Sequence, residues 1–350
     1  MSGTQEQVNT EIKNYYSEVI KSNQDLKTSA CCPVESMPIY VREIAKCIHP
    51  EVVSRFYGCG SPIPNAVKNR VVLDLGCGTG RDSFIFSKLV GEYGRVIGID
   101  MTSSQIAIAN EYADYHRDKF GYLSSNTIFL EGNIEDLSSI NIDDNSVDIV
   151  TSNCVLNLCF DKQKAFKEIL RVLKPGGELY FSDVFCSRRI PEYLQKDPVL
   201  RGECLGGALY IEDFRRLLAK LGCHDYRLVS NTRIQINNKY IESKLGDIEF
   251  LSMTIRAFKI ELEDRCEDYG QIAWYLGGIE ESPNQFILDD HHLFERDRPM
   301  LICSNTARIL SQSRFSAFFK VHGKETKHFG LFECGSPSTV YGPSVPSSCC

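Results

Sequence analysis

Three cysteines in this sequence stand at positions that suit a reacting or ligand-binding group. Cys154 follows the apolar run that ends in TSN, Cys59 lies between two glycines in FYGCGSPIP, and Cys204 shortly precedes two glycines in GECLGG. Sulfur is the natural ligand for a soft, thiophilic centre, whereas oxygen and nitrogen acceptors usually need a base. If the three sulfurs meet, they form a cup that holds such a centre.

The segment VVLDLGCGTGRD predicts a ligand site at the end of a strand. Gly76, Gly78 and Gly80 allow the backbone to approach a ligand, and Asp100 ends the next apolar run, where it can accept hydrogen bonds from ribose hydroxyls. The spacing is GxGxG, unlike the GxGxxG of dinucleotide sites, and Asp74 beside it would repel a pyrophosphate. A cationic sulfonium with a free amino group would be attracted, so the segment favours S-adenosylmethionine.

Further residues complete the predicted cofactor site. Asn133 and Ile134 follow the third apolar run, where an adenine would be held. Tyr57 is predicted either to make a cation–π contact over the sulfonium or to be an aromatic residue of the core, and the sequence does not distinguish these two roles. Met101 and Asn153, next to the ends of the second and fourth runs, belong to the same predicted set.

These residues need a sheet to position them, and the apolar pattern supplies one. Five apolar runs, RVVLDLG, GRVIGID, NTIFLEG, SVDIVTSN and GELYFSDV, alternate with helical patterns near 81–90, 103–118 and 161–173. Continuously apolar strands separated by helices predict a parallel sheet covered on both faces. The expected fold is therefore α/β and Rossmann-like, with an inserted segment and a smaller α+β C-terminal region.

The pattern along the chain divides it into five parts. A helical segment with thiol loops precedes the sheet, with helical stretches expected near 11–27, 39–47 and 51–57. After the sheet we expect a helix at 211–221 and strands near 225–236 and 247–260. The last residues are rich in Ser and Pro and are expected to be disordered. The predicted boundaries are 1–64, 65–185 for the cofactor domain, 186–262 for the inserted segment, 263–335 for the C-terminal domain and 336–350 for the tail.

Composition narrows the classes of function. The chain has 350 residues and a formal net charge of -7, which argues against nucleic acid or an anionic membrane as a partner. It has no apolar run of about 18 residues and begins without a signal-peptide pattern, so we expect a cytoplasmic protein.

The 15 cysteines do not form repeated CxxC pairs at zinc-finger spacing, so no structural metal is expected. Seven are expected to be small buried side chains: Cys47, Cys77, Cys159, Cys186, Cys223, Cys266 and Cys303.

Several of these motifs together resemble a known family. The glycine segment, Asp100 and the KPGG turn before GELYFSDV resemble class I S-adenosylmethionine-dependent methyltransferases over about 65–185. With LKTSACC, FYGCGSPIP, GIDMT, SNCVLNL and GECLGGALY added, the chain over about 10–260 closely resembles the arsenite methyltransferases. The C-terminal third resembles them more loosely, and the final Cys349-Cys350 is similar to family members that end in two cysteines.

The resemblance implies an activity and a set of ligands. Cys59, Cys154 and Cys204 would hold trivalent arsenic so that its lone pair points at the S-methyl group of the cofactor, and no general base would be required. The substrates would be arsenite and methylarsenite as thiol conjugates, giving mono- and dimethylated arsenicals, with trimethylated product left open. The resemblance also implies residues 186–262 as the arsenic-binding segment. We expect a monomer.

Methyl transfer oxidises arsenic, so a reductant is implied as well. The family implies a disulfide made during turnover between Cys59 and Cys31 or Cys32; aligning TSAC selects Cys31, while spacing leaves Cys32 open. Glutathione or thioredoxin would be the external reductant. Two alternatives remain at this point, a small-molecule C-methyltransferase of the quinone-biosynthesis type and a non-catalytic metalloid-binding protein.

Overall fold

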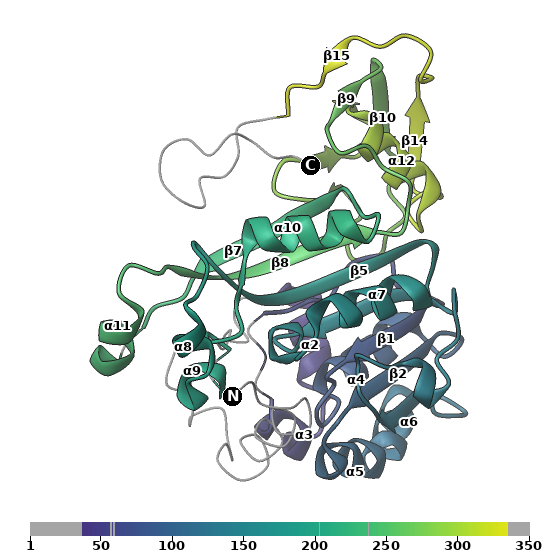
Figure 1. Ribbon diagram of the computed structural model, residues 1–350. Coiled ribbons are helices and arrows are strands. Elements are labelled where there is room, and N and C mark those ends of the chain that lie inside the picture. Colours follow the sequence, from purple (N-terminus) through teal and green to yellow (C-terminus); the bar gives the residue numbers. More distant parts are fainter. Residues whose placement is uncertain (1–36, 57, 59, 203, 237, 335–350) are drawn as a thin grey trace.

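A computed structural model describes residues 37–334 except 57, 59, 203 and 237. Its largest element is a sheet of eight strands in the order β3-β2-β1-β4-β5-β8-β7, with the short β6 beside the end of β5 (Figure 1). The five strands expected from the apolar runs form its parallel part. They are β1 (Val71–Leu75), β2 (Arg95–Asp100), β3 (Thr127–Glu131), β4 (Val147–Asn153) and β5 (Leu173–Cys186).

Helices cover both faces of the parallel part, as the buried strands require. Neighbouring strand residues point to opposite sides: Val72 packs in one core and Leu73 in the other. The first core contains side chains from α2 (Ile39–Ala45), α3 (Pro50–Ser54), α4 (Arg81–Val90), α5 (Ser103–Glu111) and α6 (Ala113–Phe120). The second contains side chains from α7 (Lys162–Val172) and α10 (Ile211–Lys220). The predicted α/β fold is confirmed.

The sheet extends beyond the boundary expected at residue 185. The strands β8 (Phe250–Phe258) and β7 (Tyr226–Arg233) pair antiparallel next to β5, so this part of the predicted 186–262 segment continues the central sheet. Short elements lie between: α8 (Glu192–Gln195), α9 (Pro198–Gly202), β6 (Leu209–Tyr210) and α11 (Lys239–Leu245). Apolar side chains of α8, α9 and α11 form a separate core, to which Cys154 and Cys204 also belong.

The expected turn at KPGG is a break within β5. Pairing between β4 and β5 moves from Val147 opposite Leu173 to Ile149 opposite Glu178, which leaves the four KPGG residues outside the regular ladder. Gly176 has a φ of 78°, a conformation that glycine adopts without a steric penalty. Short 3-10 turns lie on either side of β4, at Ser138–Ile140 and Leu156–Leu158.

The C-terminal region packs its own core onto the end of the sheet. Small antiparallel sheets and a helix surround an aromatic cluster to which Phe258 of β8 also belongs. Its elements are β9 (Glu267–Asp268), β10 (Gln271–Tyr275), β11 (Gln285–Ile287), β12 (Leu293–Glu295), β13 (Pro299–Ile302), α12 (Ser304–Gln312), β14 (Phe319–His322) and β15 (Gly330–Leu331). The helix expected at 11–27 and the tail at 336–350 lie outside the described residues.

A buried carboxylate between two arginines joins the sheet to this region. Glu178 on β5 is fully buried; Arg256 of β8 donates to it at 2.6 Å, and Arg314 of the C-terminal region forms a second ion pair with it. Arg314 also donates to the carbonyl oxygen of Asn65, just before β1. One carboxylate therefore links β5, β8, the C-terminal region and the entrance to β1.

We expect Glu178→Gln to destabilise the protein strongly, because it leaves two buried guanidinium groups without their counter-charge. Breaking a buried ion pair in this way costs about 3–5 kcal/mol. Urea unfolding followed by circular dichroism measures the change. Glu280→Gln removes the partner of Lys68 in a largely exposed pair and should leave the midpoint unchanged; similar midpoints for the two variants would refute the structural role of Glu178.

Candidate active site

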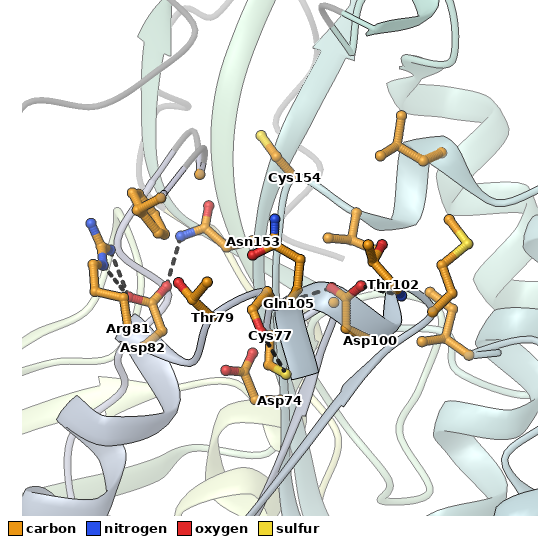
Figure 2. A pocket seen from close by; sticks show the side chains of 18 of the residues that line it. Asp74, Cys77, Thr79, Arg81, Asp82, Asp100, Thr102, Gln105, Asn153 and Cys154 are labelled. Carbon is orange, nitrogen blue, oxygen red and sulfur yellow. Dashed lines mark hydrogen bonds and ion pairs between the residues drawn. The ribbon is translucent and has the colours of Figure 1, made fainter. Parts of the chain in front are cut away.

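A pocket lies at the carboxyl ends of β1, β2 and β4 and is lined by most of the predicted cofactor residues (Figure 2). Ligands of open α/β sheets bind at this edge, because the loops that follow parallel strands meet there. The predicted residues that line it are Asp74, Gly76, Gly78, Asp100, Met101, Asn133, Ile134 and Asn153. Gly80 is not among the described lining residues; it caps α4 with a φ of 90° and packs against Phe84 and Phe129. Tyr57 lies outside the described residues.

The glycine segment and Asp100 form one hydrogen-bonded unit. The Asp100 carboxylate accepts a hydrogen bond from the backbone N–H of Gly78 at 3.0 Å and from that of Thr102 at 2.8 Å. A Cβ added at Gly78 would meet no atom within 4 Å, so the backbone there faces open space. A Cβ at Gly76 would strike Val155 at 2.3 Å. Gly78 thus leaves room for a ligand, while Gly76 allows the loop to pack.

Asp74 is a buried carboxyl beside a second one. Its side chain accepts a hydrogen bond from Ser83 Oγ at 2.5 Å, and burial, followed by the negative charge of Asp82, raises the pKa of Asp74 to about 7. An uncompensated carboxylate here is costly, so a cation in the pocket would be stabilised by it. This electrostatic setting fits the positively charged end of S-adenosylmethionine.

Asn153 joins three segments at the end of β4. Its amide nitrogen donates to Asp82 Oδ2 at 2.9 Å and to the Gly60 carbonyl oxygen at 2.9 Å, while its amide oxygen accepts from Gly60 N–H at 3.1 Å. A Cβ on Gly58 would lie 2.5 Å from the Asn153 side chain, and one on Gly60 would lie 2.4 Å from Ser182. The glycines on either side of Cys59 therefore let this segment lie directly against the ends of β4 and β5.

Cys154 and Cys204 are adjacent in space although they are far apart in the chain. Cys204 Sγ lies 3.6 Å from the carbonyl oxygen of Cys154, and both residues belong to one buried core. Cys154 lines the pocket, whereas Cys204 is not among the described lining residues. Both have left-handed backbone angles, with φ of 58° and 60°. Such angles are uncommon in residues other than glycine, asparagine and aspartate, and they concentrate at functional sites.

The sulfur of Cys154 differs from the free thiol that the sequence interpretation assumed. In the structure Cys154 is disulfide-bonded, and the other described cysteines are not. A sulfur in a disulfide is not a thiolate ligand until the bond is reduced. Cys31, Cys32 and Cys59 lie outside the described residues.

The sequence interpretation missed several residues of the pocket wall. Arg81 and Asp82 form a buried ion pair at 2.6 Å, and the Arg81 guanidinium lies 3.1 Å from the centre of the Phe56 ring. Arg81 and Asp82 directly follow GCGTG in the sequence, so their place in the pocket wall could have been predicted from this position. Further lining residues are Arg55, Cys77, Thr79, Thr102, Gln105, Gly132, Glu135, Val155, Leu158 and Cys159.

The fold and this pocket define a class I S-adenosylmethionine-dependent methyltransferase. A family model described as a methyltransferase domain matches residues 66–222, and one described as the arsenite methyltransferase C-terminal domain matches residues 270–340. An arsenite methyltransferase of Aquipseudomonas alcaligenes is 48% identical over 326 residues, which cover 93% of this chain and 94% of that protein. The Homo sapiens arsenite methyltransferase is 42% identical over 319 residues, 90% of this chain and 84% of the human protein.

A solved structure agrees with the sequence relatives. The crystal structure of an arsenic(III) S-adenosylmethionine methyltransferase from Chlamydomonas reinhardtii has a TM-score of 0.83 and 44% identity, and it covers 85% of this chain and 100% of that one. The chain belongs to the arsenite methyltransferase family. This membership excludes the quinone-biosynthesis class and a non-catalytic binding protein as its family. In the described part of the chain, no helix is long and apolar enough to cross a membrane.

The raised pKa of Asp74 predicts a pH-dependent affinity for S-adenosylmethionine. Below about pH 7 the carboxyl is protonated and cannot pair with the cation, so affinity should fall by up to about tenfold for each pH unit lost. Calorimetric titrations between about pH 5.5 and about pH 7.5 keep the ligand's amino group charged. Asp74→Asn should remove most of this pH dependence, and Asp114→Asn, at an exposed carboxylate, should keep it. A flat profile in the unsubstituted protein would contradict the role of Asp74.

Proposed function

We propose that this protein transfers methyl groups from S-adenosylmethionine to trivalent arsenic that is bound by Cys59, Cys154 and Cys204. The observation that carries the proposal is the position of Cys154, which lines the cofactor pocket and contacts Cys204 through its carbonyl oxygen. Two soft ligands beside the pocket suit a thiophilic acceptor and have no role in methylating oxygen or nitrogen.

Cys59 is proposed as the third arsenic ligand because of how the neighbouring residue, Gly60, is held. Gly60, the residue after Cys59, is held by two hydrogen bonds to Asn153, and Asn153 is the residue before Cys154. The short link through Asn153 keeps the backbone on one side of Cys59 close to the end of β4. This supports Cys59 as a partner of Cys154 and Cys204 in one arsenic site.

The chemistry that follows needs positioning more than acid–base catalysis. The arsenic lone pair forms the bond to the methyl carbon while the carbon–sulfur bond of the sulfonium breaks, and its electrons stay on that sulfur. Arsenic gives up no proton, so no general base is required, and holding both partners in line can supply about 7–11 kcal/mol of the barrier reduction. Asp74 and Asp100 hold the donor from one side, and the cysteines hold the acceptor from the other.

Thiol exchange by protein cysteines must accompany the methylation of arsenite, whereas a small external thiol can take over the reduction when methylarsenite is the substrate. Methyl transfer raises arsenic to the pentavalent state, and two electrons from a dithiol return it to the trivalent state, which leaves a disulfide. We assign this disulfide to Cys59 with Cys31 or Cys32, with glutathione or thioredoxin as the final reductant. The Cys154 disulfide of the structure must also be reduced before arsenic binds. We propose a cytoplasmic monomer that produces mono- and dimethylated arsenicals.

Serine substitutions should separate the roles of the cysteines. Cys154→Ser and Cys204→Ser should abolish methylation of arsenite and of methylarsenite, because a hydroxyl is a poor ligand for arsenic. Cys59→Ser, Cys31→Ser or Cys32→Ser should lose activity on arsenite but keep it on methylarsenite, which needs only two protein sulfurs. Product speciation by chromatography with each substrate supplied separately measures this. Substantial turnover of methylarsenite by Cys204→Ser would rule out the proposed ligand set.

Gly60→Ala tests whether the position of the Cys59 segment matters. The new methyl group would lie 2.4 Å from Ser182, so the segment must move away from β5. We expect activity on arsenite to fall at least about tenfold, a loss of about 1.4 kcal/mol in transition-state stabilisation. Affinity for S-adenosylmethionine and activity on methylarsenite should change little. Circular dichroism of the variant checks that its folding is unchanged, and equal loss on both substrates would overturn this assignment.

A further inference from the structure

A second group of cysteines lies in the C-terminal region, apart from the pocket. Cys266 and Cys303 are buried together, and the half-buried Cys334 packs against them with Phe332. The pocket adjoins β1, β2 and β4, whereas this group lies beside β9, β15 and α12 (Figure 1). The expectation that Cys266 and Cys303 are buried is confirmed, but the sequence did not predict that they meet.

Three separate chain segments bring these sulfurs together. Cys266 precedes β9, and its carbonyl oxygen accepts a hydrogen bond from the N–H of Phe332 at 2.8 Å, directly after β15. Cys334 follows two residues later, with its N–H donating to the Phe332 carbonyl oxygen at 3.0 Å. Cys303 is the N-cap of α12, and its Sγ accepts from the N–H of Thr306 at 3.5 Å. The small sheet thus holds two thiols against the start of a helix.

Positive charge reaches Cys303 from the central sheet. Arg227 of β7 is buried, and one of its Nη atoms lies 4.0 Å from Cys303 Sγ. Hydrogen bonds from the Cys266 and Cys334 thiols lower the pKa of Cys303 most; Arg227 and Thr306 lower it further, against the opposing effect of burial. The thiolate is therefore favoured at Cys303, and it is the form that binds soft electrophiles and metals.

The arrangement suits a ligand that needs two sulfurs. Structural zinc takes four ligands in a tetrahedron. Among the described residues, the group of metal-type ligand atoms that all lie within 4.8 Å of one another is Asp289, Asp290 and His291, and the cysteine group is not included. The three sulfurs therefore do not surround a single metal position. The two buried sulfurs, those of Cys303 and Cys266, instead match a trivalent arsenic that already carries one carbon, because this arsenic has two bonds left for sulfur.

We propose that Cys303 and Cys266 form a second binding site for monomethylated trivalent arsenicals, with Cys334 as the thiol that first meets the ligand from solvent. The choice of ligand rests on the proposed function, which makes this compound as an intermediate product. Two arsenic–oxygen bonds break and two arsenic–sulfur bonds form. The Cys303 thiolate displaces hydroxide, the Cys266 thiol gives its proton to the second hydroxyl, which leaves as water, and arsenic stays trivalent.

The test measures retention of methylarsenite in the full chain with the proposed methyl-transfer site disabled. The Cys154→Ser/Cys204→Ser double variant is reduced with a phosphine, mixed with methylarsenite, desalted and analysed for arsenic. Adding Cys303→Ser or Cys266→Ser should lower retention by about one arsenic per chain, because each removes one of two soft ligands. Adding Cys223→Ser, at a buried cysteine outside the group, should not change it. Adding Cys334→Ser should slow loading and leave the final amount unchanged.

The outcomes separate this site from the proposed function. Equal retention in the Cys303→Ser, Cys266→Ser and Cys223→Ser chains would overturn the second site, whether or not the unsubstituted protein methylates arsenite. Loss of retention with Cys334→Ser but not with Cys266→Ser would overturn the ligand assignment. Retention that depends on Cys303, together with no methylation of arsenite by the unsubstituted protein, would instead support the site and refute the proposed function. Circular dichroism of each variant checks that folding is unchanged, and the Cys266→Ser chain provides the test if Cys303→Ser does not fold.

Discussion

The amide of Asn153 is the contact on which the geometry of the active site depends. It ends β4, and its side chain satisfies the backbone of Gly60 on one side and the buried carboxylate of Asp82 on the other. Partly buried polar groups of this kind must be paired, so the amide fixes both neighbours at once. Because Cys154 is the next residue in the chain, the same contact relates the start of α4, the glycine-flanked segment and the thiol at the strand end.

A second set of buried contacts joins the C-terminal region to the sheet. Arg256 and Arg314 converge on Glu178 of β5, while Arg227 of β7 pairs with Asp225 at 2.7 Å and with Asp289 at 3.1 Å. Desolvated charges are tolerated only when their partners are in place. The C-terminal region is therefore docked by specific pairs as well as by its aromatic core. Arg227 takes part in this docking and also lies beside Cys303, so the attachment of the region and the state of that sulfur are physically linked.

The parallel strands and most of the pocket could be predicted from sequence because both depend on local pattern. Continuous apolar runs place β1 to β5, and loops after parallel strands meet at one edge, which brings Asp74, Asp100 and Asn133 together. The antiparallel addition of β8 and β7 could not be predicted in this way, since a strand's partner depends on packing across the whole domain. The hydrogen bonds of Asn153 and the meeting of Cys266, Cys303 and Cys334 depend on contacts between distant segments and have no local signature. Gly80 shows the opposite case: its spacing suggested a ligand contact, but it serves the packing of α4 against Phe129.

Cys154 and Cys204 both have left-handed backbone angles, so at these two positions the residue that best stabilises the fold is not the residue that supplies a sulfur. An ordinary side chain with these angles costs about 1–2 kcal/mol that glycine would not. A population of sequences selected for folding alone would thus drift toward glycine or asparagine there, and each such step would remove a sulfur. Persistence of cysteine at both positions in a set of related sequences would therefore be a record of selection for the thiols themselves. Replacement of these cysteines by glycine would identify related proteins that kept the fold after selection for the thiols had ended.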